Sequence, residues 1–290
     1  MTSRLGRLPR GVSPTIGGII GLLIVVGILL VALVGPAFVM DPQAQDISSR
    51  LLAPGQSSGA GFHPLGTDAL GRDLLAQLVW GARVSLLVGG MAVLLSGLIG
   101  VALGLIAGHF GGAIDSAIMR VVDIFMAMPF LILVLALAAV LGAGIRNIIL
   151  ALALLGWVSY TRIVRAEVLA LRQQEFVDAA LSIGVSDRRI MLRHILPNAM
   201  SSVIVLATLE LGRMILSEAS VSYLGFGVQP PTPAWGVMTA DGQQYIYSAW
   251  WVPVFPGIAI LITVLGANML GDWLRDRFDP RLLRSRSGNL

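Results

Sequence analysis

Long runs of apolar residues alternate along the chain with shorter polar segments. Four runs contain no charged residue: 11–40, 84–108, 124–145 and 242–271. Since a helix needs about 20 apolar residues to cross a bilayer, each of these runs can hold a span. Two further apolar runs, from 147 and from 195, continue into segments that carry charges. The pattern predicts an all-α membrane protein with six transmembrane helices, at residues 16–39, 84–107, 118–141, 147–164, 199–222 and 252–272.

The composition supports this interpretation. Of the 290 residues, 56% are hydrophobic and 12% are charged, and the mean hydropathy is +0.84. A soluble domain carries about 25% charged residues, so an ordinary cytosolic enzyme is excluded. The sequence has no Cys, which excludes disulfides, thiolate metal sites and Cys nucleophiles. All 20 basic residues are Arg, so there is no Lys for a Walker A loop or a Schiff base.

The first apolar run is predicted to be a retained span. Its core, from Ile16 to Val39, is longer than the roughly 7–15 residues of a signal-peptide core, and no clear small-x-small cleavage site follows it.

Arginine is distributed unevenly among the segments that connect these helices. It is concentrated before the first helix, at 162–193 and after the last helix, and with Arg120 this group counts 15. The connections on the other side hold Arg50, Arg72, Arg83 and Arg146. Because positively charged loops stay in the cytoplasm, both termini and the 162–193 loop are predicted to be cytoplasmic. The asymmetry also explains the pI of about 10.3 without nucleic-acid binding.

The connection at 41–80 is predicted to be an extracytoplasmic loop without a folded domain of its own. It contains turn sequences such as Asp41-Pro42 and Ala53-Pro54-Gly55. The connection at 225–250 is rich in Pro and aromatic residues. We interpret Trp250 and Trp251 as part of an interfacial aromatic belt, while Pro230 to Gly236 could shape an outer mouth.

Small residues recur every four positions in the second predicted helix: Ser96, Gly100, Gly104 and Gly108. This spacing places them on one helix face, where another helix can approach closely. The neighbour could belong to this chain or to a partner subunit.

The fifth predicted helix carries Glu210, Arg213 and Glu218 within an arc of about 140°. Charges inside a bilayer are costly and usually face a bundle interior or a water-filled path. The three residues are therefore candidates for a translocation path, or for a structural cluster in which Arg213 neutralises one of the Glu side chains. A membrane-embedded hydrolase is not favoured, because His63, His109 and His194 fall in loops or at span ends.

The cytoplasmic loop at 166–197 carries its own helical pattern. Residues 173–183 suit a short helix, in which Phe176, Val177, Ala180 and Ile183 recur at helical spacing. Gly184 can end this helix in a left-handed conformation, and Ser186 can cap the next one with Asp187 in its first turn. Such a helix–Gly–helix element is either a docking element or an ordinary connector.

At these residues the chain resembles a known family. Asp178-Ala179-Ala180-x3-Gly184, followed by Leu196-Pro197, resembles the EAA loop of permease subunits in binding-protein-dependent ABC importers. In that family the loop is a coupling helix that fits a groove on the ATP-binding subunit. Here Asp178 stands where Glu is usual and His194 where Ile is usual. The resemblance assigns coupling to Glu175, Phe176, Asp178, Ala179, Ala180, Gly184, Arg188 and Arg189.

Three further stretches resemble the dipeptide, oligopeptide and nickel branch of this family. They begin at His63-Pro-Leu-Gly-Thr-Asp68, at Leu224-Gly-Phe-Gly and at Asn268-Met-Leu-Gly271-Asp272. The motifs cover about residues 63–281 in the expected order, as in the C-type subunit of such importers. The resemblance implies a MetI-like fold with an extra N-terminal helix, a sister permease, two ATP-binding subunits and an extracytoplasmic solute-binding protein.

The expected function is that of a non-catalytic permease subunit in the bacterial inner membrane, without a metal or cofactor, that imports peptides. Nickel complexes or glutathione remain alternative substrates, and an autonomous secondary transporter is a less favoured alternative. The expected organisation is an N-terminal tail and first helix at 1–62, a permease core at 63–280 and a cytoplasmic tail at 281–290.

Overall fold

The computed structural model describes residues 16–59 and 61–278. Its long helices are α1 (Ile16–Val34), α2 (Leu74–Phe110), α5 (Ile145–Arg172), α8 (Leu196–Tyr223) and α10 (Trp251–Phe278). Its shorter helices are α3 (Gly112–Met126), α4 (Phe130–Leu141), α6 (Glu175–Ser182), α7 (Asp187–Arg189) and α9 (Trp235–Gly242). Single turns are η1 (Gly35–Ala37), η2 (Ile47–Ser49) and η4 (Gln243–Tyr245), and η3 (Ile190–Ile195) is a π-helix. Strands β1 (Gln56–Ser58) and β2 (Gly61–His63) form an antiparallel hairpin.

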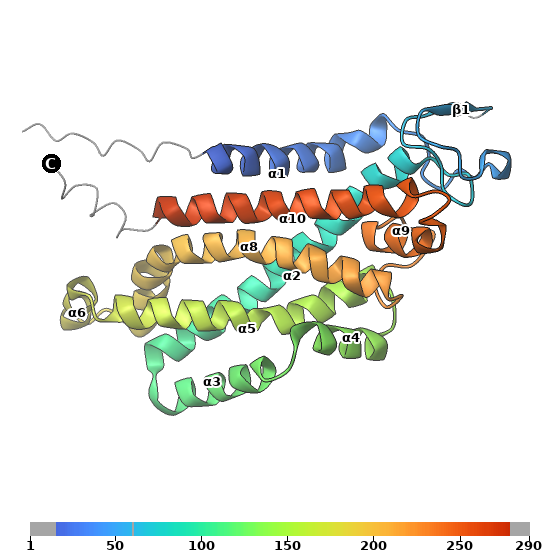
Figure 1. The fold of residues 1–290 in the computed structure, drawn as a ribbon. Helices are drawn as coiled ribbons and strands as arrows, with labels where there is room; N and C mark the ends of the chain where they lie inside the picture. Colours follow the sequence, from blue (N-terminus) through green and yellow to red (C-terminus); the bar gives the residue numbers. More distant parts are fainter. Residues whose placement is uncertain (1–15, 60, 279–290) are drawn as a thin grey trace, which may run out of the picture.

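The long helices lie side by side in one elongated bundle (Figure 1). One end of the bundle carries the β-hairpin and α9, and we call it the hairpin end. The other end carries α6 and α7, and we call it the α6 end. The beginning of α1 and the end of α10 both lie at the α6 end (Figure 1). This shared position agrees with an even number of crossings.

Five helices of the described residues are long and apolar enough to cross a membrane, and α3 with α4 makes a possible sixth crossing. The continuous helix expected at 118–141 is wrong, because α3 and α4 meet at an angle of 89°. Pro129 stands immediately before α4. It lacks a backbone N–H and disfavours helical backbone at the preceding residue, so the helix breaks there. Arg165 of α5 holds α3 in place by donating to both carboxylate oxygens of Asp115.

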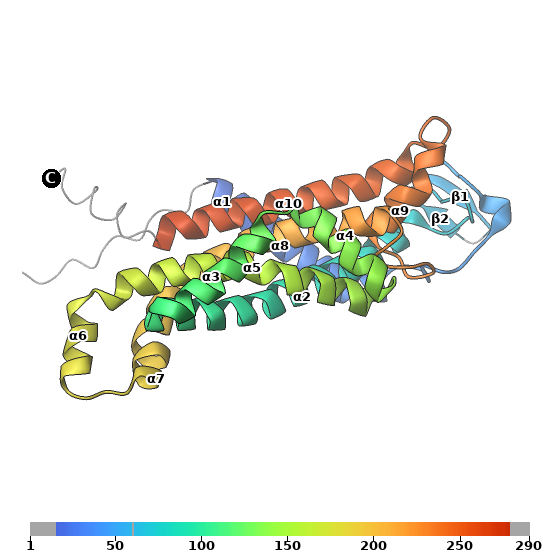
Figure 2. The same cartoon turned by 90° about the horizontal axis from the view of Figure 1, so that it is seen from below.

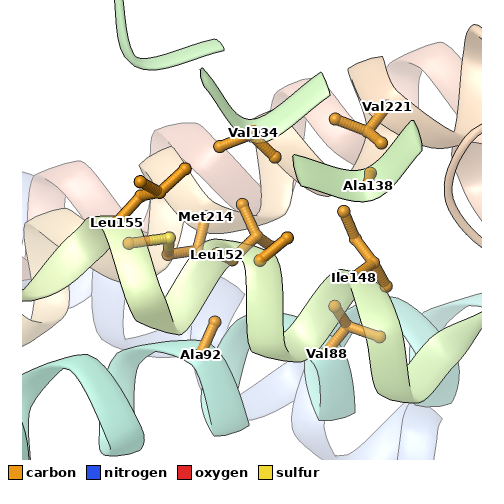
Figure 3. Packing of buried hydrophobic residues seen from close by; sticks show 10 residues of the cluster. Val88, Ala92, Val134, Ala138, Ile148, Leu152, Leu155, Met214 and Val221 are labelled. Atoms are coloured by element: carbon orange, nitrogen blue, oxygen red, sulfur yellow. The ribbon is translucent and has the colours of Figure 1, made fainter. Parts of the chain in front are cut away.

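The central core lies where α2, α4, α5 and α8 meet (Figure 3). Its side chains include Val88, Val134, Ile148, Leu152 and Met214, each 0% exposed. Small residues bring α2 and α5 together between residues 96–108 of α2 and 156–168 of α5. The helix α1 lies outside this core and packs mainly on α10, where Gly21 faces the backbone of Leu270. The remainder of α1 exposes apolar side chains, as expected of a surface that faces lipid.

The segment before α2 is more ordered than the sequence predicts. The helix begins at Leu74, ten residues before the expected start at 84, because the Asp73 carboxylate caps it by accepting from the Ala76 N–H at 2.7 Å. At 37 residues, α2 is about 55 Å long, so it extends beyond a bilayer core of about 30 Å. The predicted 225–250 loop likewise contains a helix, α9.

Several predictions concern residues outside the described part of the chain. They are the cytoplasmic Arg4, Arg7, Arg10, Arg281, Arg284 and Arg286, and the tail at 281–290.

Candidate functional site

The segment between α5 and α8 forms a loop that projects from the α6 end (Figure 2). We call residues 173–195 the α5–α8 loop. Its buried apolar side chains are Val177, Ala180, Ile190 and Ile195. They pack in one cluster with Leu105 of α2 and with Val164 and Val168 of α5. The loop is therefore seated on the bundle through one apolar face.

The outer face of α6 is exposed. The helical spacing predicts a single face for Phe176, Val177, Ala180 and Ile183, but the structure divides this set. Val177 and Ala180 face the bundle, whereas Phe176 is 41% exposed and Ile183 is 80% exposed. Glu175, Asp178 and Ala179 are also exposed. Large apolar side chains exposed among acidic residues are typical of a surface that a partner covers.

Gly184 ends α6 in the left-handed conformation that the sequence predicts, with φ of +75°. The Val185 N–H donates to the Ala180 carbonyl at 3.1 Å, and the Gly184 N–H donates to the Leu181 carbonyl at 3.0 Å. These two bonds form a Schellman motif. A Cβ added at Gly184 would meet no described atom within 4 Å. The glycine is therefore required by backbone conformation and not by packing within this chain.

The second half of the α5–α8 loop differs from expectation in its cap. Ser186 occupies the N-cap position of α7, but its side chain accepts no capping hydrogen bond. Asp187 instead reaches α2, where its carboxylate lies 3.1 Å from His109 Nε2. A shallow hollow of about 320 Å³ is lined by Ser186, Arg188, Arg189, Leu192 and Arg193. This side of the loop is strongly basic.

The small residues of α2 face α5 of the same chain. Added Cβ atoms at Gly104 and Gly108 would lie 2.8 Å from the Thr161 carbonyl oxygen and 3.0 Å from the Arg165 carbonyl oxygen. Gly100 likewise faces Trp157, and Ser96 faces Gly156. Of the two alternatives raised by the sequence, the neighbour on this face is within the chain.

Two of the three charges in α8 form a pair. Arg213 donates to Glu210 Oε2 through Nε at 2.8 Å, and its Nη2 lies 2.7 Å from the same oxygen in an ion pair. Its guanidinium carbon also lies 4.2 Å from the centroid of the Phe130 ring. Glu210 is buried, while 38% of the Arg213 side chain is exposed. The pair thus neutralises a buried carboxylate and still presents a guanidinium at the bundle surface.

Glu218 lies apart from this pair and is 0% exposed. Its carboxylate accepts from Ser85 Oγ at 3.0 Å and from Ser222 Oγ at 2.7 Å. Sequence reasoning missed both partners. Ser222 follows Glu218 by one helical turn and could have been found by that spacing, whereas no sequence pattern relates Ser85 to Glu218.

Polar side chains at the hairpin end form a network around the start of α2. His63 Nδ1 lies 2.8 Å from Asp73 Oδ2, and Asp68 accepts from Arg72 Nε at 2.6 Å and from Gln77 Nε2 at 2.9 Å. These residues belong to the motif that begins at His63. In the same end, hydrogen bonds from Ser48 and Ser49 hold the pKa of Asp46 below its usual value. The motif therefore builds structure in a segment that the sequence predicts as plain loop.

Trp251 is not part of an aromatic belt. It is 8% exposed, and its indole N–H donates to the Thr67 carbonyl oxygen at 3.3 Å. Trp250 is 52% exposed and remains compatible with such a belt. A cleft of about 470 Å³ lies at this end, lined by residues of α2 with Asp41, Pro42, Gln43, Ile145, Thr232 and Pro233, of which the last two belong to the 230–236 segment that the sequence suggests for an outer mouth.

Within residues 16–59 and 61–278, no group of three or more His, Asp or Glu side chains is arranged to hold a metal ion. The buried carboxylates are instead engaged by Arg, His, Gln or Ser.

Residues 100–284 match the family described as the binding-protein-dependent transport system inner membrane component. The dipeptide transport system permease protein DppC of Alkalihalophilus pseudofirmus is 42% identical over 91% of this chain and 86% of its own length. The di/tripeptide transport system permease protein DppC of Pseudomonas aeruginosa is 41% identical over 92% of this chain and 88% of its own length. The glutathione transport system permease protein GsiD of Escherichia coli is 46% identical over 76% of this chain and 73% of its own length.

The fold is similar to a solved structure of the MetNI methionine ABC transporter in an inward-facing conformation. The TM-score is 0.55 at 21% identity, over 72% of this chain and 95% of the compared chain. The chain therefore has the expected MetI-like fold.

Proposed function

Because this chain belongs to the family of binding-protein-dependent transport system inner membrane components, we propose that it is a permease subunit of an ATP-driven importer of peptides. The observation that carries this proposal is the similarity to two dipeptide permeases over more than nine tenths of the chain. The substrate class is di- and tripeptides. The glutathione permeases are 46% identical over a shorter part of the chain, which makes glutathione the second candidate.

In this proposal the chain is a multi-pass inner-membrane subunit that performs no catalysis. ATP is hydrolysed by two ATP-binding subunits, a solute-binding protein delivers the peptide, and a sister permease forms the other half of the path. The sequence supports the need for partners, because it contains no Walker A motif. The 1–62, 63–280 and 281–290 division of the chain is part of the same proposal.

The α5–α8 loop is the proposed contact with the ATP-binding subunits. Its exposed Phe176 and Ile183, its acidic residues on α6 and its Arg residues on α7 offer one surface of mixed apolar and charged character. Glu175, Asp178, Ala179, Gly184, Arg188 and Arg189 are exposed on this surface. Ala180 is buried, so we assign it to seating α6 on the bundle.

The α6 end is proposed to face the cytoplasm, with both termini on that side. The Arg excess in the segments at this end supports the orientation. The hairpin end, with its cleft beside α2, then faces the solute-binding protein.

The Glu210–Arg213 pair is the proposed polar element of the translocation path. A guanidinium that is 38% exposed within a predicted transmembrane helix is favourable where it meets water or a polar group. Glu218 is fully buried and bonded to two Ser side chains, so we assign it a structural role between α2 and α8.

Growth on peptides tests the proposed function. A strain that lacks this gene and cannot make one amino acid should fail to grow when that amino acid is supplied in a dipeptide. It should grow when the free amino acid is supplied, and the intact gene should restore growth on the dipeptide. Growth on the dipeptide without the gene, in a strain with no other peptide importer, would contradict the proposal. If excess glutathione in the medium prevents growth on the dipeptide, glutathione competes for the same importer and the second candidate is supported.

A further inference from the structure

His109 lies in the last turn of α2 and is 5% exposed. Its Nε2 is 3.1 Å from Asp187 Oδ1 in the α5–α8 loop, and its ring lies edge-on to Phe110 with centroids 5.1 Å apart. Among the described residues, its Nδ1 is buried without a hydrogen-bond partner. The ring is therefore held in position mainly by packing and by the single contact to Asp187.

The contact between His109 and Asp187 differs in kind from the others that hold the α5–α8 loop on the bundle. The loop is joined covalently to α5 and α8, and an apolar cluster seats it on the bundle. Within residues 16–59 and 61–278, the His109–Asp187 contact is the one polar side-chain contact from the loop to a helix that is not its covalent neighbour. Apolar contacts are non-directional, whereas a hydrogen bond fixes both distance and angle. The contact thus sets the position of α7 relative to α2.

The helix α2 extends from this contact to the hairpin end. Its first turn is capped by Asp73, and the Leu78 carbonyl oxygen accepts from the Trp235 indole N–H at 3.0 Å. Farther along, Ser85 donates to Glu218. One continuous helix of about 55 Å therefore touches the hairpin network, α9, α8 and the α5–α8 loop.

We propose that His109 and Asp187 are positioning residues that transfer movement of the α5–α8 loop to α2. The inference rests on the proposed function, in which ATP-binding subunits move this loop. When they displace α7, the His109–Asp187 contact pulls the end of α2, and α2 carries the movement toward the hairpin end. Without the contact, the apolar cluster that includes Leu105 is left to join the loop to α2, and less of the movement reaches α2.

The test uses the complete complex of both permeases, two ATP-binding subunits and the solute-binding protein in proteoliposomes, with a dipeptide as the probe. The quantity measured is the ratio of ATPase rates with and without dipeptide-loaded binding protein. Asp187→Ala and His109→Leu should each lower this ratio by about three- to tenfold, as expected for loss of one ordinary hydrogen bond, because 60% of the Asp187 side chain is exposed to solvent. Asp187→Asn and His109→Gln keep an acceptor and a donor, and should restore most of the stimulation.

Three comparisons separate positioning from folding and from direct docking. His109 is buried in α2 and offers no surface to a partner, so an effect of His109→Leu with the ATP-binding subunits retained acts through the loop. The His109→Leu/Asp187→Ala double variant should be no worse than either single variant, because both remove the same contact. Asp276→Asn removes an exposed carboxylate at the end of α10 and should leave the ratio unchanged.

Wild-type stimulation in Asp187→Ala and His109→Leu would overturn the inference. The inference would also be overturned if His109→Leu lowered the ratio of ATPase rates in parallel with its thermal stability and His109→Gln did not restore that ratio. If the wild-type complex shows no stimulation by any dipeptide, the proposed function itself fails, and that result is distinct from the failure of the contact.

Discussion

At the scale of single residues, Arg213 and Glu210 show how a charge is tolerated inside an apolar helix. The guanidinium forms a hydrogen bond and an ion pair with the buried carboxylate and stacks on Phe130. Breaking a fully buried ion pair costs about 3–5 kcal/mol, because the remaining charge is left unpaired. Since 38% of Arg213 is exposed, water compensates part of this cost.

We therefore predict that Arg213→Ala lowers the free energy of unfolding in detergent by about 1–3 kcal/mol. Glu210→Gln, added to Arg213→Ala, should recover part of the loss, because it removes the unpaired charge. Arg83→Ala is the matched control, since Arg83 stacks on Trp80 at 5.7 Å and no ion pair to it is found among the described residues. Thermal unfolding of these three variants and of Glu210→Gln alone measures the effect, and strictly additive losses at 210 and 213 would show that the two groups are not coupled.

The sequence predicts pairs of interacting side chains well where both lie on one helix, because their spacing then decides whether they meet. Glu210 and Arg213 are three positions apart and pair as that spacing allows. Partners that come from distant elements cannot be read from the sequence in this way. Glu218 with Ser85, His109 with Asp187 and Trp251 with Thr67 are brought together by tertiary packing alone.

At the scale of elements, the contact between α2 and α5 depends on residues without side-chain bulk. A Cβ at Gly104 would lie 2.8 Å from both the Thr161 carbonyl oxygen and Val164 Cβ. Backbone atoms cannot rotate away, so the helices must separate.

Gly104→Ala is expected to destabilise the protein by about 1–3 kcal/mol. Gly90→Ala is the control within the same helix, because a Cβ there meets no described atom within 4 Å. That variant should be neutral or up to about 1 kcal/mol more stable, since Ala favours the helix over Gly. Thermal unfolding of both variants in the same detergent tests this. Equal changes in stability at the two positions would show that the close packing of α2 on α5 does not determine the effect of the substitution.

Two substitutions at Gly184 separate the effect of backbone strain from the effect of side-chain bulk on partner docking. Any non-Gly residue at φ of +75° pays roughly 1 kcal/mol or more, but a side chain there finds open space in this chain. Gly184→Ala should therefore keep most of the transport rate. Gly184→Trp pays the same strain and adds bulk toward the ATP-binding subunit, so it should insert into the membrane normally, abolish uptake and weaken retention of that subunit. Co-purification and uptake of a labelled dipeptide measure the two effects, and equal transport by both variants would remove Gly184 from coupling.

Hydrophobic runs locate most helices but not their breaks or their ends. The third predicted span has no charge over 124–145, yet Pro129 divides it into α3 and α4 at 89°. Apolarity measures affinity for the membrane, while backbone hydrogen bonding decides whether the helix continues. The early start of α2 has a similar cause, because the Asp73 cap lies beyond the apolar run.

At the scale of the whole molecule, the bundle has two chemically different ends. The α6 end carries the Arg-rich loop, and the hairpin end carries the network of His63, Asp68, Arg72 and Asp73. Since the sequence has no Cys, single thiols can be introduced without a background signal.

Ser57→Cys should react with a membrane-impermeant thiol reagent in intact cells, whereas Ser186→Cys should react only after the membrane is opened. Both positions are exposed. Ser57 is preferred to Ser58, whose hydroxyl lies 3.0 Å from His63 Nε2. The reverse labelling pattern would invert the proposed orientation and place the α5–α8 loop out of reach of ATP.

The most direct test of the central claim is ATP-driven uptake of a labelled dipeptide by the purified complex in proteoliposomes. With this chain, its sister permease, the ATP-binding subunits and the loaded solute-binding protein present, we predict dipeptide accumulation against its gradient when ATP is supplied on the side of the α6 end. Accumulation should stop with a non-hydrolysable ATP analogue and with Gly184→Trp in place of the wild-type chain. Accumulation that continues without ATP, or without this chain, would contradict the claim that it is the permease of an ATP-driven peptide importer.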